Sequence, residues 1–287
     1  MKLVNDFKAY EILDLNNGQK LESWAGVILS RPDPQVIWKN EKKEIWSKAH
    51  ACYERSNTGG GKWKINKNIP SSWTINYHDL KFNLKLMGFK HTGLFPEQAY
   101  NWNLIREKIK KANRKIKVLN LFAYTGAATI AALSAGASVV HVDSSRGMIE
   151  WAKENVKLNH LEDKEVRFLV DDVRKFVKRE IRRGNKYDMI IMDPPSFGRG
   201  AKNEVWNIET DLDDLIKDVA ELLSDEPILF LINSYTTGLS KTVLEDILYL
   251  RINTKHKGCI SSDELALPVV NSKLILPCGI YARWESN

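Results

Sequence analysis

An acidic Pro-Pro step follows a short apolar stretch in the second half of the 287-residue chain. The residues Asp193, Pro194 and Pro195 come directly after the apolar run 187–192 and are followed by Ser196 and Phe197. Two consecutive prolines fix an extended backbone and remove two N–H donors, so the Asp193 carboxylate and the proline carbonyls form a rigid set of acceptors. Such a set can hold the N–H-bearing edge of a base while the Phe197 ring stacks on it. The competing interpretation is a loop that the prolines merely stiffen.

A glycine turn ends an earlier apolar stretch. Phe122-Ala123-Tyr124-Thr125-Gly126 follows the run that begins at Lys117. Gly126 permits a sharp bend and lets a ligand approach the backbone, and the start of the next helix offers free N–H groups. Tight packing between strand and helix explains a single glycine equally well.

Acidic residues follow the next two apolar stretches. Asp143 comes 17 residues after Gly126, where a carboxylate can accept both ribose hydroxyls of an adenosine. The alternative role of Asp143 is a helix cap, which Ser144 or Ser145 could also provide. Either Asp171 or Asp172 can reach an adenine amino group; we favour Asp171, and a cap for the following helix is again the alternative.

Alternating strand and helix patterns place these residues at one edge of a sheet. We expect strands at 117–122, 138–143, 166–170, 187–192 and 227–232. Helices are expected at about 99–113, 126–135, 145–159, 172–183, 210–223 and 240–252. Two further strands, 259–267 and 274–284, have no convincing helix between them, which indicates an antiparallel hairpin. The fold class is therefore α/β, a Rossmann-like sheet of parallel strands with a terminal antiparallel hairpin. Asn233-Ser234-Tyr235 ends the fifth strand, where we favour an ordinary polar turn over a role in the acceptor pocket.

Residues 1–90 have a different pattern and are expected to form a smaller β-rich accessory domain before a catalytic domain at 91–287. Tyr10–Leu15 alternates apolar and polar positions, and Asn17-Gly18 is a hairpin turn signal. Short strand-like pieces follow at Leu21–Leu29 and Val36–Trp38, and alternation resumes over Trp73–Met87.

The net charge of +7 is concentrated in this first part of the chain. Residues 1–90 hold 15 Lys and Arg against 9 Asp and Glu, whereas residues 91–287 hold 28 against 27. Aromatic rings alternate with cations at Trp38-Lys39, at Lys42-Lys43 with Trp46-Ser47-Lys48, and at Lys62-Trp63-Lys64. Stacking combined with phosphate contacts is how single-stranded nucleic acid is often held, so an RNA partner is favoured. Tryptophans in the core of a small β domain are the alternative.

The remaining composition excludes several classes of protein. Hydrophobic residues make up 43% and charged residues 28%, and no apolar run approaches the roughly 18 residues of a membrane span. The first residues lack a signal-peptide pattern, so we expect a cytoplasmic protein with no membrane partner. Three distant cysteines and six histidines show no metal-ligand spacing, so no metal is expected.

Taken together, these motifs resemble class I S-adenosylmethionine-dependent methyltransferases, and more narrowly the bacterial 23S rRNA large-subunit methyltransferase group. The resemblance covers about residues 91–285 and depends on five segments: Gly93–Gln98, Asn120–Gly126, Val142–Ser145, Val170–Asp172 and Asp193–Phe197. It implies S-adenosyl-L-methionine as cofactor. The contacts that it implies or makes expected are Phe95, Gln98, Phe122, Ala123, Tyr124, Gly126, Asp143, Ser144, Asp171, Asp172 and Asp193.

One departure from that group concerns the acceptor. Methylation at cytosine C5 needs a cysteine nucleophile, but the positions where relatives place it hold Ser196 and Ser234. Methylation of a nitrogen needs only alignment of its lone pair and removal of a proton by water or Asp193. We therefore expect a methyltransferase acting on a base nitrogen of RNA, with Asp193, Pro194 and Phe197 at the acceptor.

Three alternatives are weighed against this interpretation. A small-molecule methyltransferase with a basic accessory domain would show no salt-dependent affinity for RNA. A dinucleotide-dependent oxidoreductase would need a Gly-x-Gly-x-x-Gly run, of which only Gly126 is present. A catalytically silent RNA-binding protein would bind RNA without the cofactor.

Overall fold

A computed structural model describes residues 1–41, 44–56, 60–199 and 205–287. These residues divide into two compact units. The first unit comprises Met1–Tyr100 and Leu265–Cys278, and the second comprises Asn101–Glu264 and Gly279–Asn287. The chain therefore returns to the first unit near its end, through the terminal pair of strands.

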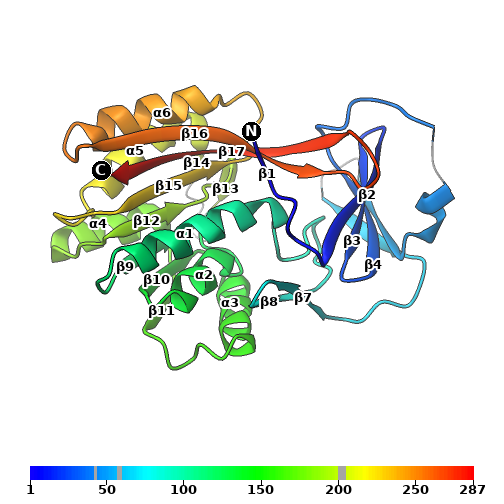
Figure 1. The fold of residues 1–287 in the computed structure, drawn as a ribbon, viewed down its shortest axis with the longest axis horizontal. Helices are drawn as coiled ribbons and strands as arrows, with labels where there is room; N and C mark the ends of the chain where they lie inside the picture. The colour runs from blue at the N-terminus through cyan, green and yellow to red at the C-terminus, as the bar shows by residue number, and fades with distance from the viewer. Residues whose placement is uncertain (42–43, 57–59, 200–204) are drawn as a thin grey trace. The chain divides into compact units, whose positions relative to one another are not determined.

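The parallel strands of the second unit form the core of a mixed sheet (Figure 1). The strand order is β1-β16-β17-β15-β12-β9-β10-β11. The strands from β15 to β11 are parallel, and β17 pairs antiparallel with β15. Their bounds are β1 Lys2–Leu3, β9 Lys117–Leu121, β10 Ser138–Asp143, β11 Val166–Val170, β12 Met189–Met192, β15 Leu229–Ser234, β16 Gly258–Pro268 and β17 Ile275–Ser286. The predicted fold class is confirmed, including the antiparallel strand that the terminal hairpin adds.

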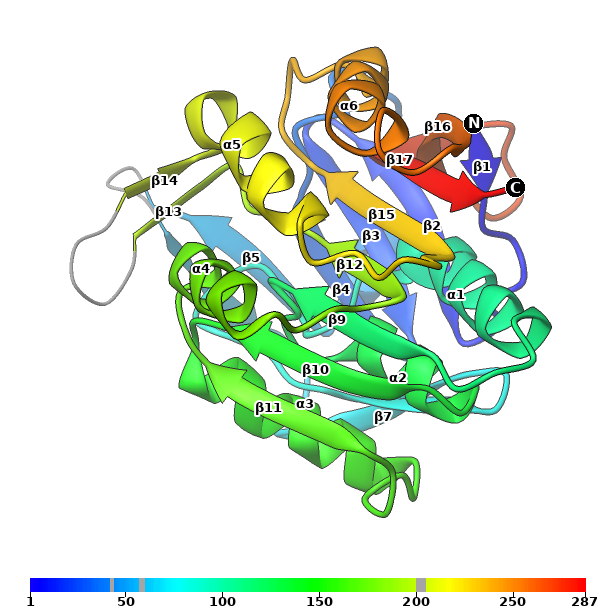
Figure 2. The same ribbon diagram turned by 90° about the vertical axis from the view of Figure 1, so that its left-hand side faces the viewer.

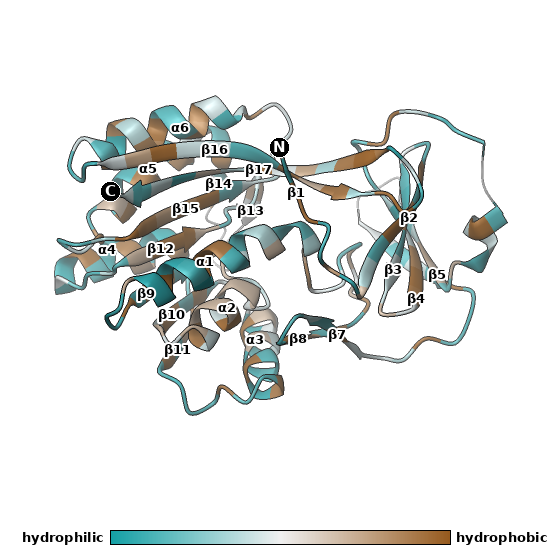
Figure 3. Cartoon of the chain, viewed as in Figure 1, coloured by the Kyte–Doolittle hydropathy of each residue, from teal (hydrophilic) through white to brown (hydrophobic). Residues whose placement is uncertain are grey.

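Continuous apolar runs explain why these strands lie in the middle of the sheet. All four residues of β12 and all six of β15 are buried, and both strands are brown in the hydropathy colouring of Figure 3. A parallel strand covered by helices on both faces has no polar side, so alternation is not expected there. The register aligns the strand ends, since Leu121 lies beside both Val142 and Met192.

Helices follow each parallel strand, as the sequence predicts (Figure 2). They are α1 Ala99–Lys111, α2 Ala127–Ser134, α3 Arg146–Leu158, α4 Val173–Arg183, α5 Ile208–Ala220 and α6 Lys241–Leu248, which continues as the π-helix η3 Tyr249–Asn253. Helices α4, α5 and α6 pack into one apolar cluster with the central strands, and α2 contacts α3. Side-chain caps fix three helix starts, at Asp172, Asn207 and Ser240.

The first unit is built from two small sheets. Its five-stranded sheet has the order β2-β3-β4-β5-β6, and β7 and β8 form a separate hairpin. The bounds are β2 Tyr10–Asn16, β3 Gln19–Trp24, β4 Val27–Pro32, β5 Ala51–Arg55, β6 Gly61–Ile65, β7 Trp73–Tyr77 and β8 Leu80–Leu84, with a 3-10 helix η1 at Glu44–Lys48. The Asn17-Gly18 hairpin is confirmed, and both turn residues have the positive φ that such a turn requires.

Two expectations for the first unit are corrected. Val36–Trp38 is not a strand, because the carbonyls of Val36 and Trp38 accept hydrogen bonds from the hairpin turn at Gly18 and Asn17. The stretch Leu21–Leu29 is not continuous either. It is divided into β3 and β4 by a second turn at Ala25-Gly26, where both residues have positive φ.

Candidate active site

The loop between β9 and α2 has an unusual backbone. Phe122, Tyr124 and Gly126 have φ values of 55°, 50° and 87°, so three alternate residues lie in the left-handed region. This region is unfavourable for bulky side chains and is found where the surrounding structure enforces it, often at functional sites. Ala123 N–H donates to the carbonyl of Val142 (3.1 Å), which ties the loop to the neighbouring strand.

Two interpretations of Gly126 were open, a turn that a ligand approaches and tight packing between strand and helix, and both need a glycine here. A Cβ atom at this position would lie 3.0 Å from Ala152 Cβ, so helix α3 packs directly against the turn. The Asn155 amide of α3 also donates to the Thr125 carbonyl (3.0 Å) in a buried hydrogen bond. Tight packing therefore accounts for the glycine, and it also holds the loop in the conformation that a cofactor would meet.

Asp143 connects this loop to the end of β10. Its two carboxylate oxygens accept the backbone N–H groups of Tyr124 (2.9 Å) and Ser145 (2.8 Å). Burial raises the pKa of Asp143, and these two hydrogen bonds oppose that rise. The N-cap of α3 is Ser145, whose side chain makes no cap hydrogen bond, so Asp143 is not the cap residue itself. A carboxylate has about four acceptor positions, which leaves room for two ribose hydroxyls.

The two aspartates after β11 have separate roles. Asp172 is the N-cap of α4 and accepts the N–H of Lys175 (3.0 Å). Asp171 is not the cap; its N–H donates to the Asp143 carbonyl (3.0 Å) and its carboxylate forms an ion pair with Arg179. The capping interpretation therefore holds for Asp172, and Asp171 stays the predicted adenine contact.

The residues Asp193–Phe197, called the acidic proline corner below, begin beside the glycine loop 122–126. The Asp193 N–H donates to the carbonyl of Leu121, the last residue of β9 (3.4 Å). Pro194 is buried, while Phe197 is 57% exposed at the start of β13 (Phe197–Arg199). The Ser196 hydroxyl lies 2.7 Å from that of Thr236, and the Ser196 carbonyl accepts the N–H of Ile208. The corner is thus fixed from two sides. The sequence of the basic segment Gly198–Lys202 suits either a substrate-phosphate contact or a solvated loop, and residues 200–202 of it lie outside the described residues.

Trp206 joins the two loops and was not identified from the sequence. It lies in β14 (Val205–Asn207), opposite Gly198 of β13. Its indole N–H donates to the Pro195 carbonyl (2.6 Å), and its ring lies 5.6 Å from that of Phe122. The Pro195 carbonyl is therefore engaged within the protein, which narrows the expected acceptor set to Asp193 and the Pro194 carbonyl.

A chain of buried polar side chains lies beneath the glycine loop. Asn120 Nδ2 donates to Thr129 Oγ1 (3.0 Å), which lies 2.9 Å from His141 Nδ1. Burial lowers the pKa of His141 to about 3, opposed only in part by the backbone of Tyr124, so the imidazole is neutral at pH 7. Two polar residues inside the apolar strands β9 and β10 were the available sequence signal for this chain.

The remaining candidates from the sequence are Phe95, Gln98, Ser144 and Asn233. Phe95 directly precedes the short helix η2 (Pro96–Gln98) of the first unit, and Gln98 is the last residue of that helix. The ring of Phe95 lies 5.4 Å from that of His91. Ser144 is exposed next to Asp143. Asn233 is buried at the end of β15 and accepts a hydrogen bond from Asn101 Nδ2 (2.8 Å), so it is more than a surface turn.

Two of the three tryptophans in the ring-and-cation segments donate indole hydrogen bonds within the first unit. Trp46 Nε1 donates to Asp14 (2.7 Å), and Trp63 Nε1 donates to the Met87 carbonyl (2.9 Å). Trp38 is half-buried. Lys42 and Lys43 lie outside the described residues. None of the three rings is fully buried, so the core interpretation is not confirmed and RNA contact by these rings stays a prediction.

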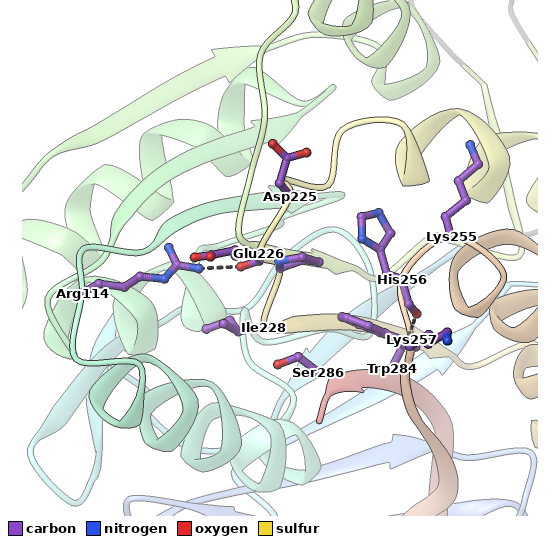
Figure 4. A pocket seen from close by; sticks show the side chains of 10 residues that line it. Arg114, Asp225, Glu226, Ile228, Lys255, His256, Lys257, Trp284 and Ser286 are labelled. Atoms are coloured by element: carbon purple, nitrogen blue, oxygen red, sulfur yellow. Dashed lines mark hydrogen bonds between the residues drawn. The ribbon is translucent and has the colours of Figure 1, made fainter.

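The opposite, amino edge of the sheet has a hollow of about 400 Å³ (Figure 4). Arg114 borders it and pairs with Asp188 (3.0 Å), and Lys255 pairs with Glu221. Within the described ranges, no three His, Cys, Asp or Glu side chains are grouped as metal ligands. Nor does any helix of that part of the chain have the length and apolar character that a membrane crossing requires.

A comparison with known proteins decides the family. A family model described as "S-adenosylmethionine-dependent methyltransferase" matches residues 53–247. The chain belongs to this methyltransferase family. It is therefore an enzyme, and its cofactor is S-adenosylmethionine.

Solved and curated relatives agree with this assignment. The crystal structure of a methyltransferase of this cofactor class from Agrobacterium tumefaciens is 32% identical, with a TM-score of 0.92, over 99% of this chain and 93% of that one. "Ribosomal RNA large subunit methyltransferase K/L" of Colwellia psychrerythraea is 29% identical over 75% of this chain. The K protein of Neisseria meningitidis is 30% identical over 68% of this chain. The matches span 28% and 51% of these two curated relatives.

The described residues fit this cofactor. The glycine turn leaves no room for a side chain at Gly126, and Asp143 has unused acceptor capacity beside it. Asp171 follows β11, which pairs with β10, and Asp193 follows β12, which pairs with β9, so both lie at the same edge of the sheet as the glycine turn and Asp143. The individual contacts remain predictions.

Proposed function

We propose that this methyltransferase modifies a nitrogen atom of a base in ribosomal RNA, in the cytoplasm. The names of the curated relatives support ribosomal RNA as the substrate class. The observation that carries the choice of a base is the fixed corner of Asp193 and Pro194 beside the glycine loop, with an exposed Phe197 ring next to it. We further propose residues 1–90 as the accessory RNA-binding domain and 91–287 as the catalytic domain.

In this proposal the cofactor's adenosine lies across the ends of β9, β10 and β11. Asp143 accepts the ribose hydroxyls and Asp171 accepts the adenine amino group. S-adenosylmethionine supplies a methyl group on a positively charged sulfur. Because the loop conformation is fixed by Asp143 and Asn155, the protein holds the donor without reorganising.

At the acceptor, Asp193 and the Pro194 carbonyl hold the N–H edge of the base and orient the nitrogen lone pair. The Phe197 ring stacks on the base. The proton leaves to water or to the Asp193 carboxylate as the nitrogen gains its methyl group. A nitrogen acceptor is supported by the serines at the two expected cysteine positions, since Ser196 pairs with the Thr236 hydroxyl and Ser234 Oγ accepts the Thr236 N–H.

The test is methyl transfer to RNA from a strain that lacks the gene. Purified enzyme and radiolabelled S-adenosylmethionine should label the large-subunit ribosomal RNA of that strain but not RNA from the parent. Mass spectrometry of the digested nucleosides should show one N-methylated base. Label in small molecules with none in RNA would contradict the proposal.

Asp193→Asn should reduce turnover about 100-fold or more, because the variant loses the charged acceptor at the reacting nitrogen. Cofactor affinity, measured by calorimetry, should change by no more than about threefold. A variant with parental turnover would remove Asp193 from the acceptor site.

A further inference from the structure

The loop Met87–Lys90 of the first unit has no regular structure, yet its backbone is held firmly. Four hydrogen bonds from side chains of the five-stranded sheet hold its carbonyls: Trp63 Nε1 donates to Met87 (2.9 Å) and Phe89 (3.2 Å), Tyr53 Oη to Gly88 (3.5 Å), and Arg31 Nη1 to Lys90 (3.0 Å). Tyr53 and Trp63 also pack edge to face, with ring centres 5.4 Å apart. The sheet thus fixes how this loop presents its side chains.

The ring of Phe89 is presented to solvent by this fixed loop. Phe89 is 63% exposed. A single exposed aromatic residue is common and needs no explanation by itself. Here, however, its backbone carbonyl is anchored by Trp63, so the exposed ring lies in a defined place rather than on a free loop.

The charges beside Phe89 are unbalanced. Arg31 binds Glu22 through two nitrogens (2.6 and 2.7 Å), and Lys20 lies 3.2 Å from Asp33 and 3.6 Å from Glu22. The carboxylates of Glu22 and Asp33 are therefore already paired with Arg31 and Lys20.

Lys90 is the third cation of this group, and neither Glu22 nor Asp33 pairs with it. Within the part of the chain that the structure describes, Lys90 forms no ion pair, and its ammonium reaches only the Pro32 carbonyl (3.4 Å). Burial, together with the nearby Lys20, Arg31 and Arg55, lowers the pKa of Lys90 to about 8, although Asp33 opposes the shift. An anion at this position would relieve the excess of positive charge.

We propose that Phe89 and Lys90 contact a single-stranded segment of the RNA substrate, with one base stacked on Phe89 and the adjoining phosphate bound by Lys90 and Arg55. Arg55 is exposed and follows Tyr53 by two residues in β5, so both lie on the same face of the sheet. Stacking on an aromatic ring next to a phosphate contact is the usual arrangement for single strands. The proposal rests on RNA being the substrate.

Fluorescence anisotropy with a short labelled oligocytidylate RNA and the full-length protein tests the two contacts. Phe89→Ser and Lys90→Gln should each weaken binding about tenfold, as expected for one stacking or one phosphate contact. Only Lys90→Gln should reduce the salt dependence, lowering the slope of log K against log salt by about 1. The matched control is Lys81→Gln, an exposed lysine of the separate β7–β8 hairpin, which should stay within about twofold of the parent.

The pH dependence separates a direct phosphate contact from a structural role. Only the protonated ammonium binds phosphate, so the affinity of the parent should fall as the pH rises above about 8. Lys90→Arg should bind RNA as well as the parent at pH 7 and lose this pH dependence. A polyphosphate without bases should lose affinity for Lys90→Gln but not for Phe89→Ser.

The outcomes distinguish this surface from the proposed function. If the parent neither binds nor methylates RNA, the RNA substrate itself is wrong. If the parent methylates RNA and both variants bind it like the parent, with unchanged thermal unfolding and cofactor affinity, the Phe89–Lys90 surface is wrong and the function stands. Equal effects of Lys81→Gln and Lys90→Gln would also overturn the surface.

Discussion

The two edges of the central sheet in the second unit differ in how they use their polar groups. At the amino edge, Arg114 and Lys255 border a hollow (Figure 4). Arg114 is paired with Asp188, and Lys255 with Glu221. The Trp284 indole N–H there is also bonded, to the His256 carbonyl (3.0 Å). These groups satisfy one another within the protein.

At the carboxyl edge the backbone is strained and the Asp143 carboxylate keeps unused acceptor capacity. Phe122 and Tyr124 have positive φ, which costs energy that only the surrounding contacts offset. Asp143 is engaged by two amides but by no cation among the described ion pairs. The difference shows that a hollow alone does not identify a site. Enforced strain next to acceptors with room for a ligand is the better indicator.

Of the variants that compare the two edges, Asp143→Asn should have the largest effect, a loss of cofactor affinity. Loss of two charge-assisted hydrogen bonds to ribose, of about 1.5 kcal/mol each, should raise the dissociation constant for S-adenosylmethionine about 100-fold in calorimetry. Asp188→Asn is the matched control at the amino edge, because Asp188 also accepts a backbone N–H, from Lys117 (2.9 Å). Its cofactor affinity should be unchanged. Equal affinity in the Asp143 variant and the parent would remove the ribose assignment.

Trp206→Phe should have the next largest effect. The substitution keeps an aromatic ring near Phe122 but removes the N–H that holds the Pro195 carbonyl. Turnover should fall about tenfold, roughly the worth of one hydrogen bond, while cofactor affinity stays within about twofold. The KM for RNA and kcat, measured separately, show whether the acceptor corner has moved. A change confined to thermal stability would make Trp206 a purely structural residue.

The neutral His141 beneath the glycine loop predicts a loss of stability in acid. Its pKa is about 3 in the folded protein and near 6.5 when unfolded, so the unfolded state binds more protons as the pH falls. The free energy of unfolding is unaffected by this group above about pH 6.5 and declines from there toward pH 3. The loss in the free energy of unfolding reaches roughly 2 kcal/mol at pH 5. Denaturant unfolding of the parent and of His141→Gln at pH 7 and 5 measures it. An identical pH dependence in both proteins would contradict a buried neutral imidazole.

Arg114→Ala should have the smallest effect. Arg114 is partly exposed, so its pair with Asp188 is worth about 0.5 kcal/mol of folding free energy at most. Turnover and cofactor affinity should not change if the amino edge has only a structural role. Reduced RNA methylation in this variant would instead show that the second edge takes part in function.

The order of strands and helices was predictable because each element carries its own signal. Apolar runs ended by Gly126, Asp143 and Asp193 define the strand ends, and parallel pairing brings those ends to one edge. The capping role of Asp172, rather than Asp171, needed the observed start of α4.

Contacts between distant parts of the chain were not predictable. Trp206 reaches Phe122 and Pro195 only because β13 and β14 form a hairpin, for which a single sequence has no clear signal. The positive φ of Phe122 and Tyr124 runs against the preference of aromatic residues, so it is visible only in the structure. The fixed positions of Phe89 and Lys90 were likewise not predictable, because Trp63 and Arg31, which bind their carbonyls, are distant in the sequence.

A crystal structure of the protein with S-adenosylhomocysteine tests the central claim most directly. We predict that the adenosine lies across the ends of β9, β10 and β11, with its ribose hydroxyls on the Asp143 carboxylate and its sulfur directed toward Asp193. An adenosine bound away from the ends of β9, β10 and β11, for example at the amino edge beside Arg114, would contradict this prediction.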